Sequence, residues 1–261
     1  MKMFITDWDG TLYRDDTVEE KAFNLLHKLS DNKIVIVVAT GRNLYSAHKV
    51  IMPNFPIDYL IFSSGAGIMN WKQKKIIRKH HMKKEDLEKI VSYLKKENLD
   101  FMVHQQLPDN HWFLYHRTQN HNPDFERRIK LYKKFKLPVA NWESKASQVL
   151  AIIPNNPNIH KKIKQDFPQL NIIRTTSPLD GNSIWIEIFP KEVSKSKAAK
   201  WLCQKLKVTK SIAIGNDYND EDLLEWSDRS YIIKSAPQAL LKKYYVCENI
   251  SSVLEKEFCF K

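Results

Sequence analysis

The stretch that decides the fold is the first one, MKMFITDWDGTLYRDD (1–16), in which a short apolar run ends at two acids, Asp7 and Asp9. Alternate side chains of an extended chain point to the same side, so the two carboxylates are expected to lie close together. Like charges that close repel, and at least one pKa rises unless a cation lies between them. A simple turn is the favoured interpretation of Asp-Trp-Asp-Gly taken alone. A calcium loop is not, because its remaining ligands and its closing glutamate are missing.

The composition indicates an ordinary globular protein. The 261 residues, 43% hydrophobic and 28% charged, suffice for one large domain or two smaller ones. No apolar run approaches the ~20 residues of a membrane helix, and the N-terminus shows no signal peptide. Three cysteines without metal spacing, Cys203, Cys247 and Cys259, favour reduced structural thiols. We therefore expect a cytoplasmic protein with no membrane partner.

The formal net charge of +12 admits several anionic partners. The lysines, however, are spread along the chain in pairs such as Lys83-Lys84, Lys95-Lys96 and Lys161-Lys162. Such a pattern is more typical of a solvated helical surface than of a binding stripe. We therefore expect no nucleic-acid partner.

Four apolar runs predict strands that are buried on both faces: MFIT (3–6), IVIVVA (34–39), YLIF (59–62) and SIAI (211–214). Helical spacing marks residues 18–32 and 195–206, and LYSAHKVIM (44–52) follows the second strand. Alternating strands and helices predict an α/β fold with a doubly wound parallel sheet, as in Rossmann-like proteins.

The middle of the chain has a different pattern. A predicted helix (83–99) is followed by strands around a Pro-Asp-Asn turn, a helix (123–135), a strand (149–154), a further helix and a strand (182–190). This order predicts an α+β domain, residues 79–187, inserted into a core formed by residues 1–78 and 188–261.

Five of the six glycines follow the four predicted parallel strands: Gly10, Gly41, Gly65, Gly67 and Gly215. Ligands of open α/β sheets bind outside the carboxyl ends of the strands, where glycines let the backbone approach an anion. The acids of the opening stretch, the Thr40-Gly41-Arg42 segment and the acids Asp217 and Asp220 should therefore converge on one edge. This convergence outweighs the interpretation of DWDG as a turn alone.

The motifs, taken together, resemble the haloacid dehalogenase (HAD) superfamily of phosphohydrolases, in particular its Cof-type (IIB) sugar-phosphatase-like branch. In order along the chain they are DWDGTL (7–12), VVATGRN (37–43), IFSSGAGI (61–68), IEIFPKEVSKSKAAKWL (186–202) and AIGNDYNDEDLL (213–224). The resemblance covers the whole chain, and the inserted domain corresponds to the family's cap, which excludes water and selects the leaving group.

The resemblance implies three catalytic residues. Asp7 would be the nucleophile that forms an aspartyl-phosphate, and Asp9 would be the general acid and base. Lys195 would offset the charge of Asp7 and phosphate, although Lys197 lies close enough in sequence to be confused with it. A Mg²⁺ ion near Asp7 would explain why two acids are crowded together.

The phosphate-binding residues implied by the resemblance are Gly10, Thr11, Thr40, Gly41, Arg42 and Asn219. Thr40 is alternatively the N-cap of the helix after it. Arg42 would contact substrate or pair with an acid.

The expected metal residues are Asp7, Asp9, Asn216 and Asp217. The family usually has an aspartate where this chain has Asn216, so an amide replaces a carboxylate there. Asp217 or Asp220 is the alternative source of that carboxylate, and Asp220 is also a candidate partner of Lys195. An acidic turn that only caps the next helix is the structural alternative for this segment.

These expectations converge on a Mg²⁺-dependent phosphatase that hydrolyses a small phosphorylated metabolite, such as a sugar phosphate. A phosphotransferase or mutase with the same chemistry is one alternative. A basic binding protein on a catalytically decayed fold is the other, and intact Asp7, Asp9, Thr40 and Lys195 argue against it.

Overall fold

A computed structural model describes residues 1–138, 146–177 and 183–258. The chain forms two compact units. The first contains Met1–Arg42, Ala47–Arg78 and Ser194–Lys261, and the second contains Asn43–Ser46 and Lys79–Val193. The sequence-based boundary at residue 187 lies inside the last strand of the second unit, which continues to Pro190.

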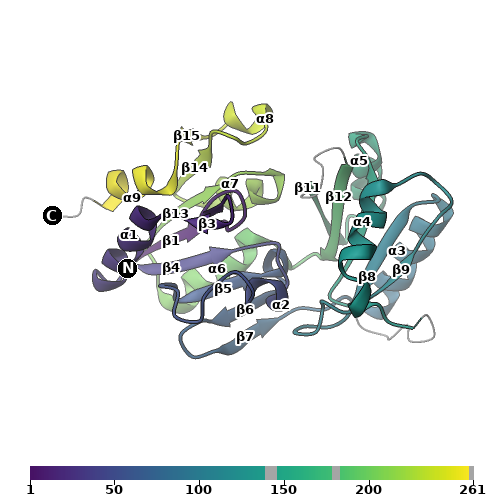
Figure 1. The fold of residues 1–261 in the computed structure, drawn as a ribbon, viewed down its shortest axis with the longest axis horizontal. Helices are drawn as coiled ribbons and strands as arrows, with labels where there is room; N and C mark the ends of the chain where they lie inside the picture. Colours follow the sequence, from purple (N-terminus) through teal and green to yellow (C-terminus); the bar gives the residue numbers. More distant parts are fainter. Residues whose placement is uncertain (139–145, 178–182, 259–261) are drawn as a thin grey trace. The chain divides into compact units, whose positions relative to one another are not determined.

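The first unit is built on an eight-stranded sheet (Figure 1). In spatial order its strands are β15 (Tyr245–Cys247), β14 (Arg229–Ile233), β13 (Lys210–Gly215), β1 (Lys2–Thr6), β4 (Val35–Ala39), β5 (Tyr59–Phe62), β6 (Gly67–Asn70) and β7 (Lys75–Lys79). The six strands from β15 to β5 are parallel, and β6 runs antiparallel to β5. The chain thus leaves β1 in one direction through β4 and β5 and returns on its other side through β13, which is the doubly wound order predicted from the sequence.

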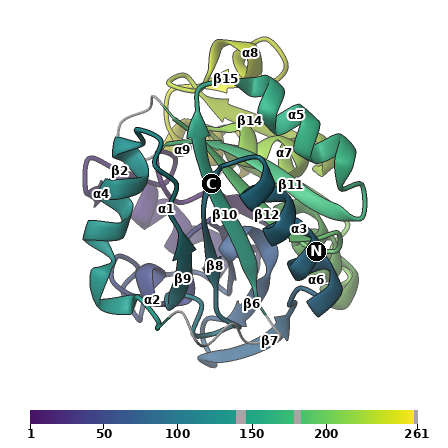
Figure 2. The ribbon, with the colours of Figure 1, turned by 90° about the vertical axis from the view of Figure 1, so that its right-hand side faces the viewer.

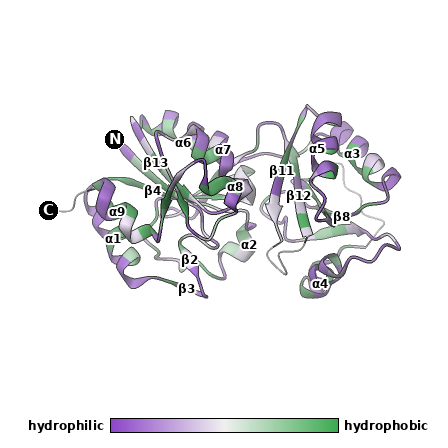
Figure 3. Ribbon diagram, turned by 90° about the horizontal axis from the view of Figure 1, so that it is seen from above, coloured by the Kyte–Doolittle hydropathy of each residue, from purple (hydrophilic) through white to green (hydrophobic). Residues whose placement is uncertain are grey.

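Strand β1 shows why the sheet needs helices on both faces. Met3 and Ile5 lie in one apolar cluster with Ala199 and Leu202, whereas the ring of Phe4 meets that of Phe258 edge to face at 6.1 Å. Neighbouring β4 is buried along its length and is green throughout in Figure 3. Strands that bury both sets of side chains have continuous apolar sequences, and for this reason the sequence identified them.

The helices of the first unit are α1 (Glu20–Asp31), α6 (Lys195–Leu206), α7 (Glu221–Trp226), α8 (Gln238–Leu241) and α9 (Ile250–Phe258), with 3₁₀ turns η1 (Ser63–Gly65) and η3 (Tyr218–Asp220) and a small hairpin of β2 (Tyr13–Arg14) and β3 (Thr17–Val18). Helix α2 covers only Leu44–Ala47, shorter than the expected 44–52. Pro53 disfavours helical backbone at Met52, and the chain turns at Val50 and Ile51 instead.

The second unit is a five-stranded antiparallel sheet covered by helices (Figure 2). Its strands, in spatial order, are β11 (Leu170–Thr176), β12 (Ser183–Pro190), β10 (Gln148–Pro154), β8 (Asp100–His104) and β9 (Phe113–His116). Its helices are α3 (Lys84–Lys96), α4 (Pro123–Leu131) and α5 (Pro157–Asp166), with the 3₁₀ turn η2 (Lys133–Phe135). Alternation along β8 sends Phe101 and Val103 towards the cluster that contains α3 and α5, and Met102 towards Phe125 of α4.

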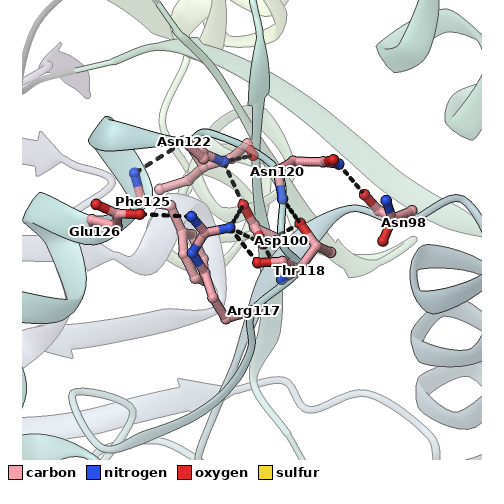
Figure 4. Close-up of polar contacts among 9 residues, drawn as sticks. Asn98, Asp100, Arg117, Thr118, Asn120, Asn122, Phe125 and Glu126 are labelled. Carbon is pink, nitrogen blue, oxygen red and sulfur yellow. Dashed lines mark hydrogen bonds and ion pairs between the residues drawn. The ribbon is translucent and has the colours of Figure 1, made fainter.

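A buried carboxylate ties α4 to this sheet (Figure 4). Asp100 accepts hydrogen bonds from Arg117, from the backbone and hydroxyl of Thr118, and from the side chain of Asn122. Asn122 in turn caps α4 by accepting from the Phe125 N–H at 3.2 Å. The network is fully partnered at Asp100, which is the condition under which a buried charge is tolerated.

Every helix in the described parts of the chain is too short or too polar to cross a lipid bilayer.

Candidate active site

A fully buried lysine joins the first and last motifs at the carboxyl end of β1. Lys195 Nζ lies 2.6 Å from Asp7 Oδ1 and 2.6 Å from Asp220 Oδ1, and all three side chains are almost completely buried. Asp7 follows β1, Lys195 begins α6, and Asp220 ends η3 beyond β13. Since β13 pairs with β1 in parallel, these segments meet although Lys195 and Asp7 are 188 residues apart in sequence.

The single ammonium of Lys195 contacts the carboxylates of both Asp7 and Asp220. The pKa values of Asp7 and Lys195 reflect this two-to-one ratio of opposite charges. Burial raises the pKa of Asp7 to about 8, and the Asp220 carboxylate raises it too, against the opposing effect of Lys195. For Lys195, burial acts to lower the pKa, but Asp220 and Asp7 outweigh it and raise the pKa above its ordinary value. When Asp7 is ionised, two carboxylates face one ammonium, and a further cation would offset this excess of negative charge.

Asp220 is oriented by its own loop. Its Oδ2 accepts from the backbone N–H groups of Asn216 at 2.9 Å and Asp217 at 3.2 Å. A Cβ on Gly215 would lie 2.5 Å from the Cβ of Asp220, so only glycine allows this close approach. The glycine of the GNDYND motif is thus explained by packing against Asp220.

Helix α6 holds Lys195, and not Lys197, in the buried position. Ser194 caps the helix by accepting from the Lys197 N–H at 3.2 Å, and Asp222 accepts from the Ser196 N–H at 3.1 Å. The sequence analysis did not single out Ser194 or Asp222. A serine directly before an apolar helical pattern is an N-cap signal that identifies the first of them.

Asp9 and Arg42 form a two-point ion pair. Arg42 Nε lies 2.8 Å from Asp9 Oδ2, and a terminal nitrogen lies 2.6 Å from Oδ1. Arg42 therefore pairs with an acid, the second of the two roles that the sequence allowed. The pair is partly exposed, with 28% and 47% of the two side chains accessible.

The residues predicted to bind phosphate surround this end of the sheet. The Thr40 hydroxyl accepts from the Arg42 N–H at 3.1 Å, and the N-cap of α2 is Asn43, which accepts from the Ser46 N–H at 2.8 Å. Thr40 is thus not the helix cap. Thr11 is buried, and its hydroxyl has no hydrogen-bond partner in the described chain. Gly41 is partly exposed beside Thr40, and Asn219 is partly exposed within η3 next to Asp220.

Asn216 and Asp217 differ in their surroundings. The Asn216 side chain packs on the loop after β1, since a Cβ on Gly10 would lie 2.3 Å from its Nδ2. Asp217 is the N-cap of η3 and forms a capping box with Asp220. The geometry brings Asn216 beside the Asp7 loop and engages Asp217 in the turn.

The donor set at this edge consists of oxygen atoms of the kind that magnesium binds. Among the described residues, no three His, Cys, Asp or Glu side chains gather as metal ligands. Magnesium needs fewer side chains, because it keeps several waters and accepts carboxylate and carbonyl oxygens. The negative excess around Asp7 fits such a cation.

Comparison with known proteins identifies the family of the chain. A sequence model described as haloacid dehalogenase-like hydrolase matches residues 4–250. The chain belongs to this family. No curated protein matches it.

Several solved structures share the fold of this haloacid dehalogenase-like hydrolase. SMU.1108c from Streptococcus mutans superposes with a TM-score of 0.80 at 17% identity, covering 99% of both chains. BT1666 from Bacteroides thetaiotaomicron, described among phosphatases, gives 0.78 at 17% identity over 98% of this chain and 93% of its own. BT4131, described as a HAD subclass IIB sugar phosphatase, gives 0.76 at 16% identity over 98% of both chains. At these identities the likeness establishes the shared fold.

Proposed function

We propose that the protein is a Mg²⁺-dependent phosphatase that hydrolyses a small phosphorylated metabolite through an aspartyl-phosphate on Asp7. The observation that carries the proposal is the buried Lys195 held 2.6 Å from both Asp7 and Asp220 at the end of the central strand. Burying three charges is costly, and a fold retains them where the chemistry requires them. The sugar phosphatase among proteins of the same fold supports a phosphorylated sugar or a similar metabolite as substrate.

Asp7 acts as the nucleophile in this proposal. One of its oxygens attacks phosphorus, the bond to the leaving oxygen breaks, and an acyl phosphate forms on Asp7. Lys195 is bound to the Oδ1 atom and keeps that carboxylate oriented, while Asp220 keeps the ammonium in place.

Asp9 moves the protons. Once it has taken up a proton, Asp9 donates that proton to the departing oxygen; the resulting carboxylate then removes one from the water that attacks the phosphorylated Asp7, so that free phosphate leaves and Asp7 is regenerated. Its side chain lies next to Arg42, which fixes the direction of the carboxylate before the substrate binds.

The phosphate oxygens would be held by hydrogen-bond donors around the same edge. Thr11 supports this assignment, since its buried hydroxyl has no partner in the described chain. Thr40, Gly41 and Asn219 complete the set, with the backbone at Gly10 close to Asn216.

Asp7, the backbone carbonyl of Asp9 and the side chain of Asn216 would hold the magnesium ion, with Asp217 as the alternative ligand. When bound, the ion supplies positive charge that offsets the carboxylates and the phosphate. We also propose a cytoplasmic location, which the free thiols of Cys203 and Cys247 support.

The test is a panel of phosphorylated metabolites and one aryl phosphate, assayed with and without Mg²⁺. We expect Mg²⁺-dependent release of phosphate, and a loss of more than about 10³ in rate for Asp7→Asn. Circular dichroism and thermal melting of the variant establish that it is folded. Near-normal turnover by folded Asp7→Asn would disprove the mechanism, and transfer of phosphate to a sugar hydroxyl instead of water would identify a phosphotransferase.

A further inference from the structure

Two serines directly after β5 have an unusual backbone conformation. Ser63 and Ser64 form the turn η1 together with Gly65, and the φ angles of the three residues are 49°, 52° and 104°. We call these three residues the left-handed turn. Serine rarely adopts a left-handed backbone, because its Cβ then lies too close to the following carbonyl oxygen. The two serines are therefore under backbone strain.

Burial distinguishes this turn from the other left-handed residues. Ser63 and Ser64 are 1% and 0% exposed. In the parts of the chain that the structure describes, six further non-glycine residues have a positive φ, and all are exposed at surface turns or helix ends: Asp15, Asp16, Lys33, Lys74, Asn98 and Lys207. Strain persists in a buried segment only where the surrounding structure imposes it, and such segments gather at functional sites.

The left-handed turn holds the segment that carries Thr40 and Arg42. The Ser64 N–H donates to the Thr40 carbonyl at 3.0 Å. The Ser63 N–H donates to the Arg42 carbonyl at 2.8 Å. Both donors are backbone groups, so their directions depend on the φ and ψ angles of the turn and not on the serine side chains. Because Arg42 pairs with Asp9, the turn also bears on where that carboxylate lies.

The same turn packs against the residue that precedes Lys195. A Cβ on Gly65 would lie 2.2 Å from the carbonyl oxygen of Ser194, so only glycine allows this close approach. Ser194 is the N-cap of α6, and Lys195 is the first residue of that helix. The left-handed turn thus contacts both the Thr40–Arg42 segment and the start of the helix that carries the buried lysine.

We propose that the left-handed turn is a positioning element of the candidate active site, and that its backbone sets the spacing between the Thr40–Arg42 segment and Lys195. The inference deepens the proposed function and rests on it, since this spacing serves catalysis only if these residues act on phosphate and Asp7. The serines act through their neighbours, so they are positioning residues.

Two substitutions at Ser64 separate the contribution of its backbone from that of its hydroxyl group. Ser64→Gly removes the hydroxyl group, but glycine adopts a left-handed backbone without strain. Ser64→Thr keeps the hydroxyl group, but a β-branched residue strongly disfavours this backbone.

The matched controls are Lys207→Gly and Lys207→Thr. Lys207 has a similar backbone conformation, with φ of 55° and ψ of 43°, and it is the exposed C-cap of the same helix that begins with Lys195. Substitution there changes the backbone strain by the same physical means, but at the opposite end of the helix.

Hydrogen exchange of the full chain, measured by mass spectrometry, tests the spacing without any turnover. We expect Ser64→Thr to accelerate exchange about tenfold in peptides that cover residues 40–43 and 194–198, and Ser64→Gly to resemble the wild type. Lys207→Thr should accelerate exchange only around the end of α6. Unchanged exchange of both peptides in folded Ser64→Thr would overturn the proposal. If Ser64→Thr does not fold, Ser63→Thr takes its place.

Steady-state kinetics with an aryl phosphate test whether the spacing matters for the reaction. We expect Ser64→Thr to lower kcat about tenfold with a smaller change in KM, and Ser64→Gly and both Lys207 variants to keep kcat close to that of the wild type. A purely structural turn would lower the melting temperature of Ser64→Thr and Lys207→Thr and spare kcat in both, which would overturn the proposal. A loss of kcat in Ser64→Gly equal to that in Ser64→Thr would also overturn it.

The two measurements keep this inference separate from the proposed function. A wild-type protein that releases no phosphate, but whose exchange responds to Ser64→Thr as expected, would refute the proposed function and retain the coupling through the turn. An active wild-type protein whose exchange does not respond would refute the positioning role alone.

Discussion

Arg42 holds both carboxylate oxygens of Asp9, with nitrogen-to-oxygen distances of 2.6 and 2.8 Å. A planar guanidinium fixes the plane of the carboxylate as well as its position, which a lysine ammonium does not do. Since Asp9 is the proposed proton carrier, this pair decides where the carboxylate points before a substrate arrives.

Replacing Arg42 should therefore slow catalysis. We expect Arg42→Gln to lower kcat for an aryl phosphate by about 10- to 100-fold, the loss that follows when a reacting group is misplaced. Arg42→Lys should fall between this variant and the wild type. Steady-state kinetics at saturating substrate measure the effect, and a rate that rises on substitution would show that the pair restrains Asp9 instead of positioning it.

Asn216 should set the magnesium requirement. Asn216→Asp adds a carboxylate beside the Asp7 loop, and direct attraction to a divalent ion should lower the Mg²⁺ concentration needed for half-maximal activity. Turnover at saturating Mg²⁺ should change less. Activity is titrated against Mg²⁺ for this variant and for Asp217→Ala.

The variant Asp217→Ala tests whether Asp217 acts as the N-cap of η3 or as a ligand of the magnesium ion. Because Asp217 caps η3, the substitution should lower the free energy of unfolding by about 1 kcal/mol, with little change in the Mg²⁺ midpoint. A collapse of Mg²⁺ activation in Asp217→Ala, with no response at Asn216→Asp, would assign the metal ligand to Asp217.

The Asp100 network in Figure 4 should matter for stability. Asp100→Asn removes the charge that Arg117 faces and replaces an acceptor with a donor next to Asn122. We expect a loss of about 3 kcal/mol in the free energy of unfolding, in the range found when one partner of a buried ion pair is removed. Urea denaturation compares it with Asp109→Asn, an exposed acid in the same unit, and equal stabilities would contradict the assignment.

The second unit should lose stability in mild acid because of His104. Burial, helped by the charge of Arg128, lowers the pKa of His104 from 6.5 to about 3, so the unfolded chain takes up a proton that the folded chain does not. The stability that the neutral ring provides is complete above pH 6.5 and is lost as the pH falls from 6.5 towards 3.

The variant His104→Asn isolates this effect, because its amide can still donate to Asn110 but does not titrate. Between pH 6.5 and 5, the wild type should lose up to about 1.4 kcal/mol per pH unit more than the variant. Denaturation at several pH values tests this, with His121→Asn as the exposed control. Parallel pH profiles of the wild type and His104→Asn would refute it.

The sequence predicted the elements whose side chains are buried on both faces. Strands β1, β4, β5 and β13 were identified because a short, uninterrupted apolar run is typical of a parallel strand covered by helices on both sides. The outer strands were missed. β15 has two exposed residues, Tyr245 and Val246, and β7 contains none that is fully buried, so neither shows a pattern that distinguishes it from a loop.

The candidate active site, like the fold, was predicted only in part from the sequence. The motifs indicated which residues gather after the strands, but not which atoms touch. The choice between Lys195 and Lys197 depends on where α6 begins, and that is fixed by Ser194 and Asp222. The pairing of Arg42 with Asp9 depends on side-chain torsions that no spacing encodes.

The position of β1 has a consequence for how the protein is made. Of the eight strands of this sheet, β1 comes first along the chain, and its two neighbours are β4, made soon afterwards, and β13, which ends at Gly215. Until residue 215 has been synthesised, the backbone N–H and C=O groups along one edge of β1 have no partner strand. The second unit, complete at Val193, can fold during this interval. Nascent chains stalled before β13 should therefore be the ones that chaperones retain.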